Sequence, residues 1–157
     1  MLILKLSYIP SGKSHKCNYR KIQIMIDFDN IEKRYNIKLP KEYKQFYQYA
    51  IKEINNKVEL HIENDILNIQ KFLTVSEIND ILEEYYDFFG YDIIPIAETD
   101  YGDYICLYYK RNTQNPSIIY WDYELAAESG HSSDGVSVLY KDIFQFILHL
   151  EIITNKI

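Results

Sequence analysis

Two segments near the start of the chain carry apolar residues every three or four positions, which is the period of an α-helix. The first predicted helix is capped by Asp27 or Asp29 and ends near Asn36. The second begins at Leu39-Pro40, where proline suits the first helical position because its missing N–H needs no partner there. The apolar stripes are Phe28, Ile31 and Tyr35 in the first helix and Tyr43, Phe46, Tyr47 and Ala50 in the second.

Two later segments also predict helices. Thr74 is followed three residues later by Glu77, a pair typical of a capping box, in which each side chain accepts a hydrogen bond from the other residue's backbone N–H. The helix after Thr74 carries apolar residues on one face and acids on the other. A last helix is predicted over residues 140–152. Its expected apolar side consists of Tyr140, Ile143, Phe144, Ile147 and Leu148.

Short segments between these helices have the pattern of strands. VELHIE (58–63) alternates apolar and polar residues, Asn64-Asp65 looks like a turn, and ILNIQKFLTV (66–75) continues as a second strand. IIPIA, YICLYY and SIIYWDY predict three more strands, and residues 126–136 look like a flexible loop. Short strands joined by turns predict an α+β fold, with an antiparallel sheet of about six strands flanked by helices. No βαβ alternation with glycine-rich turns occurs, which argues against a doubly wound nucleotide-binding fold.

Length and charge indicate how the chain is organised. Its 157 residues suit one domain. Residues 1–24 contain five Lys or Arg and no acid, whereas the remainder contains 12 bases and 23 acids. We therefore expect a basic N-terminal extension, a strand and loop, over residues 1–24 and a single domain over residues 25–157. An alternative is that residues 1–24 lie upstream of a natural start at Met25.

The middle of the chain is acidic. From Phe72 to Tyr109 there are nine acids and no Lys or Arg. Such a surface repels phosphates, so direct nucleic-acid binding is not expected, but it attracts a basic protein. The alternative is that the acids only keep the domain soluble. The sixteen tyrosines suit a recognition surface, although AT-rich codons account equally well for the abundance of Tyr, Ile, Asn and Lys.

Several classes of function find no support in the sequence. No apolar run is long enough to span a membrane, no signal peptide is recognisable, and two scattered cysteines suit a reducing, cytoplasmic setting. The phosphate-binding and metal-binding motifs are absent, and the four histidines have no second His or Cys at ligand spacing. We read ESGHSSDG as a solvent loop, because a flexible loop cannot hold a catalytic triad in place. We therefore expect no cofactor, no metal and no enzymatic activity.

The sharpest candidate for chemistry is the segment AETDYGDYICLYY (97–109). Glu98, Asp100 and Asp103 offer three carboxylates that suit a metal ion, acid and base catalysis, or a tight turn. The turn explains more residues, because Gly102 can adopt positive φ and aspartate favours turns by bonding its own backbone. We interpret the segment as a turn between two strands, alone or with a contact to a protein partner.

The order of these pieces resembles the SUKH superfamily, which joins a yeast cell-wall synthesis regulator with many bacterial toxin-immunity proteins. The resemblance runs from about Asp27 to Leu150 and rests on four pieces. They are IEKRYNIKLPKEYKQFY, IIPIAETDYGDYICLYY, SIIYWDYE and LYKDIFQFILHL. The resemblance implies structural roles for Leu39, Pro40, Tyr43, Pro95, Gly102 and Phe144.

The same resemblance implies a function. Bacterial members are non-enzymatic cytoplasmic proteins that bind a cognate toxin, often a nuclease or deaminase. We therefore predict an immunity protein whose partner is a toxin, expected to be basic; the alternative is a general interaction or scaffold module of the cell-wall regulator type. The expected partner-binding residues are Glu98, Asp100, Tyr101, Asp103, Tyr104, Trp121, Asp122 and Glu124. The oligomeric state and the identity of the toxin are left open.

Overall fold

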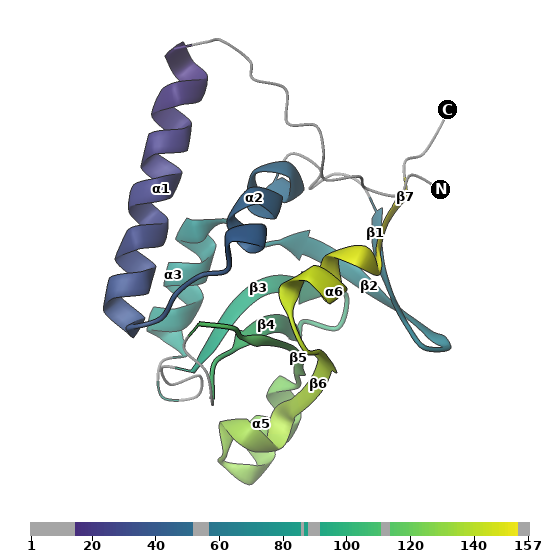
Figure 1. The fold of residues 1–157 in the computed structure, drawn as a ribbon. Coiled ribbons are helices and arrows are strands. Elements are labelled where there is room, and N and C mark those ends of the chain that lie inside the picture. Colours follow the sequence, from purple (N-terminus) through teal and green to yellow (C-terminus); the bar gives the residue numbers. More distant parts are fainter. Residues whose placement is uncertain (1–14, 52–56, 86, 88–91, 111–113, 154–157) are drawn as a thin grey trace.

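The computed structural model of the chain describes residues 15–51, 57–85, 87, 92–110 and 114–153, and these residues form one antiparallel sheet with helices packed against it (Figure 1). The α+β prediction is confirmed, with seven strands in the sheet instead of about six. The α-helices are α1 (His15–Tyr35), α2 (Lys41–Ala50), α3 (Val75–Glu84), α5 (Tyr123–Ser129) and α6 (Ile143–Leu148). The strands are β1 (Lys57–Ile62), β2 (Asp65–Phe72), β3 (Ile93–Thr99), β4 (Tyr104–Tyr108), β5 (Ser117–Trp121), β6 (Val136–Tyr140) and β7 (Leu150–Ile153).

The sheet has the order β6-β5-β4-β3-β2-β1-β7. Strands β1 to β6 therefore follow each other as a meander, and β7 returns to the free edge of β1. Bulky side chains from both the sheet and the helices fill the core, among them Leu60, Trp121 and Phe146, which are completely buried. Among the described residues, no helix combines the length and the apolar content that crossing a bilayer requires.

Helix α1 begins earlier than predicted. It starts at His15 rather than near Asp27, so residues 15–24 are helical and not a strand or loop. The prediction relied on a side-chain cap, but the buried stripe continues one turn before Phe28, because Ile24 also packs against the core. Residues 1–14 lie outside the described residues, and the boundary of an N-terminal extension stays a prediction.

The local signals around α2 and α3 are confirmed. Helix α2 begins at Lys41, one residue later than predicted, so Pro40 precedes the first turn instead of opening it, and all four residues of the expected apolar stripe are buried. The capping box of α3 is present in both directions, with Glu77 N–H donating to Thr74 Oγ1 and Thr74 N–H donating to Glu77 Oε1, each at 3.2 Å.

The C-terminal helix was predicted too long. Tyr140 ends β6 and Leu150 begins β7, so α6 covers only the six residues between Ile143 and Leu148. Asp142 accepts a hydrogen bond from Gln145 N–H at 2.9 Å and fixes where the helix begins. From that start, Ile143, Phe146 and Ile147 face the core. Phe144 and Leu148 were expected there but are exposed.

The predicted flexible loop at residues 126–136 is also wrong. It contains most of α5 and a short 3₁₀ helix, Ser132–Gly135. Asp122 caps the start of α5, and Gly130 ends it in the left-handed conformation with φ 73°. This compact α5 unit lies at one end of the molecule, at the bottom of Figure 1, beside strands β5 and β6.

Candidate functional site

The segment between β3 and β4 is the tight turn that the sequence predicts. Thr99 N–H donates to the Asp103 carbonyl at 2.9 Å, and Gly102 N–H donates to the Thr99 carbonyl at 3.1 Å. Gly102 has φ 79°, a conformation that residues with a Cβ rarely adopt. A Cβ added there would meet no atom within 4 Å, so glycine serves the backbone conformation and not a close contact.

Asp103 fastens this turn to α5. The Tyr120 hydroxyl donates to Asp103 Oδ2, and the Tyr123 backbone N–H donates to Oδ1 at 3.1 Å. Burial and then the hydrogen bond to the Asp103 carboxylate raise the pKa of Tyr120 above its usual value, so the phenol keeps its proton at neutral pH. Both oxygens of Asp103 are thus engaged within the chain, and this residue positions the surface around it.

Asp122 has a similar structural role. Its side chain accepts a hydrogen bond from Leu125 N–H at 3.0 Å, and its own N–H donates to the Gly135 carbonyl at 2.8 Å. The two backbones approach so closely that a Cβ on Gly135 would lie 2.3 Å from the Asp122 carbonyl oxygen. Asp122 therefore joins the start of α5 to the 3₁₀ helix.

Trp121 was expected on the partner surface, but the structure buries it completely. Its indole N–H donates to the Ser132 carbonyl at 3.0 Å, and its ring lies 6.0 Å from the ring of Tyr123 in an edge-on arrangement. The sequence places an aromatic residue at the end of a strand but does not reveal that α5 folds back over it. Trp121 supports the surface from beneath.

The exposed side chains of this region form what we call the acidic turn surface. Asp100 and Glu124 are exposed, and Tyr101 at the tip of the turn is 83% exposed. Glu98 and Tyr104, half-buried, lie opposite each other in the β3–β4 register. The acidic turn surface consists of Glu98, Asp100, Tyr101, Tyr104, Tyr123 and Glu124.

One aromatic contact extends this surface toward α3. The ring of Tyr123 lies 5.9 Å from that of Tyr85, the residue that follows α3. Burial and then the nearby Glu98 charge raise the pKa of Tyr104 to about 12, so this phenol also stays protonated. Sequence reasoning missed Tyr85 and Tyr123, because each comes from an element whose packing only the fold determines. Carboxylates and phenols together offer acceptors for a cationic partner and flat faces for its apolar stems.

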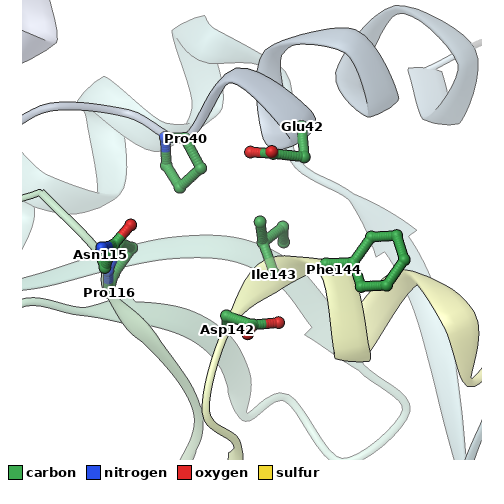
Figure 2. A pocket seen from close by; sticks show the side chains of 7 residues that line it. All are labelled: Pro40, Glu42, Asn115, Pro116, Asp142, Ile143 and Phe144. Atoms are coloured by element: carbon green, nitrogen blue, oxygen red, sulfur yellow. The ribbon is translucent and has the colours of Figure 1, made fainter.

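The residues with predicted structural roles do not belong to the acidic turn surface. Only Gly102 is close to it in the sequence, because it shapes the turn that carries Asp100 and Tyr101. Leu39 and Tyr43 are buried in the core. Pro95 is buried in β3 opposite Cys106, next to a register shift in the β3–β4 ladder. Pro40 and Phe144 line a pocket between the start of α2 and the start of α6 (Figure 2).

This pocket is too small for a typical ligand. Its volume is about 170 Å³, whereas sites for drug-sized molecules usually measure about 300–1,000 Å³. In Figure 2 the side chain of Ile143 rises into its centre, and Phe144 points away from it. The full set of lining residues is Pro40, Glu42, Asn115, Pro116, Asp142, Ile143 and Phe144. The pocket has room for one side chain of a partner and is not the main candidate site.

Comparison with models of protein families identifies the family of this chain. The model of the SMI1/KNR4 family (SUKH-1) matches residues 26–149, well over half of the chain. The matched range includes the acidic turn surface and excludes the first half of α1. No curated protein matches the chain.

Proposed function

The chain belongs to the SMI1/KNR4 family (SUKH-1), and we propose that it is an immunity protein that binds a cognate protein toxin through the acidic turn surface. The family covers immunity proteins as well as members like the cell-wall regulator, and its domain is one that binds other proteins. In this proposal the protein neutralises its toxin in the cytoplasm by binding alone, without an enzymatic step.

The observation that carries the proposal is the way the acidic turn surface is held. Its tip is exposed, while the residues behind it, Asp103, Tyr120 and Asp122, are fixed by hydrogen bonds. A surface that is rigid before binding loses little conformational entropy when a partner docks, which favours affinity. Exposed tyrosines on such a support are the side chains most enriched at the centres of protein interfaces.

The charge of the surface indicates the kind of toxin. A toxin that acts on nucleic acid needs a basic surface to hold phosphates. Carboxylates on a complementary surface speed the encounter with such a toxin and compete for the same cationic groups. Lys71 Nζ contacts Glu77 and lies 3.9 Å from Glu98. The negative charge of Glu98, at one edge of the surface, is therefore partly neutralised by Lys71. Asp100 and Glu124, further out, are the carboxylates that we expect to meet the toxin.

A growth experiment tests the proposal. Any toxin encoded by a gene next to that of this protein is expressed alone and together with this protein, and we expect the protein to restore growth. A variant with Asp100→Arg and Glu124→Arg should fold but fail to rescue, whereas Asp65→Arg, at the exposed start of β2, should rescue like the wild type.

Three results would contradict all or part of the proposal. If the protein gives no rescue from a toxin encoded beside it, the immunity function is wrong. If pull-downs instead return several housekeeping proteins, the chain is an interaction module of the cell-wall regulator type. A rescue that survives the double charge reversal would keep the immunity function but place the contact elsewhere.

A further inference from the structure

A mixed cluster of histidine and carboxylate side chains lies at the edge of the sheet where β7 joins β1. Glu59 and His61 are two positions apart on β1, so both point to the same face of the sheet. Glu151 on β7 lies directly opposite Glu59 in the antiparallel register. Two strands from distant parts of the sequence therefore bring three potential metal ligands to one place.

The ligand atoms have the spacing of a coordination shell. His61 Nε2 lies 2.8 Å from Glu151 Oε2 and 3.7 Å from Glu59 Oε2, and the three ligand atoms all lie within 4.8 Å of one another. Bonds of about 2.0–2.2 Å in a tetrahedral zinc site separate neighbouring ligand atoms by roughly 3.3 Å. The two distances to the histidine lie on either side of this value, so a metal ion needs only small side-chain movements.

The orientation of the side chains also suits a shared centre. Lys57 Nζ holds Glu59 Oε1 at 2.8 Å, which leaves Oε2 directed toward His61. His61 Nε2 is shielded from solvent and makes no aligned hydrogen bond among the described residues, although Glu151 Oε2 is close. Ligands of a metal point at the ion and not at each other, so close but misaligned atoms are what such a site presents.

The backbone around His61 is fixed. Tyr140 donates its hydroxyl proton to the His61 carbonyl at 2.9 Å, and His61 N–H donates to the His149 carbonyl at 3.3 Å. The side chains of His61 and Glu151 are 43% and 38% exposed, so the cluster lies at the protein surface, although the His61 Nε2 atom itself is shielded.

We propose that Glu59, His61 and Glu151 bind one divalent transition-metal ion, with Zn²⁺ as the best fit. Zn²⁺ accepts both imidazole nitrogen and carboxylate oxygen as ligands, whereas Ca²⁺ and Mg²⁺ prefer oxygen alone and are less suited to a set that contains histidine. Three protein ligands leave the fourth position to water. The bound ion links β7 to β1 and stabilises the edge of the sheet through mass action on the folded state.

Calorimetry and thermal unfolding test this site on the full chain after removal of metals with a chelator. We expect Zn²⁺ to bind with one ion per chain and to raise the unfolding midpoint as its concentration increases. Co²⁺ should give the visible absorption of a four-coordinate ion. Glu151→Gln, at the sheet edge, and His61→Gln should each weaken binding by roughly tenfold or more.

Matched variants make the result specific. His131→Gln and Glu63→Gln alter an exposed histidine and an exposed glutamate outside the cluster and should bind Zn²⁺ like the wild type. Absence of binding heat with Zn²⁺ would overturn the proposal. Equal binding by Glu151→Gln and the wild type would also overturn it, because the ion would then sit elsewhere.

Discussion

Two regions of the molecule depend on carboxylates: the junction between α1 and α2, and the acidic turn surface. The carboxylate at the junction is buried and paired with lysines, whereas the acidic turn surface has exposed carboxylates. At the junction, Glu32 is only 8% exposed. It contacts Lys44 Nζ, lies 3.3 Å from Lys38 Nζ, and accepts a hydrogen bond from Leu39 N–H at 3.3 Å. In the acidic turn surface, Asp100 and Glu124 are exposed to solvent. A buried charge must be paired to be tolerated, whereas an exposed charge is free to serve an encounter.

The Glu32 junction explains why the Leu39-Pro40 segment is recognisable in the sequence. The Leu39 N–H is tied to Glu32, and the preceding Lys38 carbonyl accepts a hydrogen bond from the Tyr109 hydroxyl at 2.7 Å. These contacts connect α1, the start of α2 and the end of β4. The junction therefore maintains the fold, and its acid is unavailable to a partner.

The largest expected effect comes from removing the buried charge. Glu32→Gln should lower the free energy of unfolding by about 2–3 kcal/mol, because it removes the buried carboxylate that accepts hydrogen bonds from two partly exposed lysines and from the Leu39 N–H. Denaturant unfolding measures this loss. The matched control is Glu83→Gln, whose partner Arg34 lies at 3.0 Å in an exposed pair and whose loss should cost about 1 kcal/mol or less. If both variants lose the same free energy of unfolding, the claim that the buried acid stabilises the fold more than the exposed acid is wrong.

The close backbone approach under α5 gives the next effect. Gly135→Ala should destabilise the protein by about 2 kcal/mol, because the new Cβ collides with the Asp122 carbonyl oxygen. Gly102→Ala should cost about 1 kcal/mol from backbone conformation alone, since its Cβ meets nothing. Thermal unfolding distinguishes the two. A Gly135→Ala variant as stable as Gly102→Ala would show that α5 is not held by this approach.

Stability should fall on acidification because of the Glu32 junction. Burial on its own raises the pKa of Glu32, but bonds from Lys44, Lys38 and the Leu39 N–H outweigh it and set the pKa below the usual 4.5. A lowered pKa in the folded state stabilises the protein above pH 4.5, and this contribution is lost as the pH falls through the folded pKa. The unfolding free energy of Glu32→Gln should therefore decline less below pH 4.5 than that of the wild type. If the unfolding free energies of the variant and the wild type fall in parallel with decreasing pH, Glu32 is not the cause of the loss.

Within the acidic turn, Asp103 should behave differently from Asp100. Asp103→Asn should cost about 1 kcal/mol, because it weakens the hydrogen bonds from the Tyr120 hydroxyl and the Tyr123 N–H. Asp100→Asn should change the unfolding free energy by less than about 0.5 kcal/mol, since its side chain is exposed. If both substitutions have the same effect on denaturant unfolding, the division into anchoring and exposed acids is wrong.

The sequence predicted the features that depend on neighbouring residues. The capping box of Thr74 and Glu77 and the turn at Gly102 are confirmed, because short-range hydrogen bonds and φ preferences determine both. The burial of Trp121 and the exposure of Phe144 were missed, because each depends on how a helix docks. The Glu59, His61 and Glu151 cluster was also missed, since only the pairing of β1 with β7 brings it together.

The most direct test of the acidic turn surface is the rate at which the protein associates with the toxin from which it rescues growth. The rate is measured at low and high ionic strength for the wild type and for a variant carrying Asp100→Asn and Glu124→Gln. We predict slower association of the variant at low salt and converging rates at high salt, because salt screens the attraction between exposed charges. Equal association rates at low salt would contradict the assignment of these carboxylates to the toxin-binding surface.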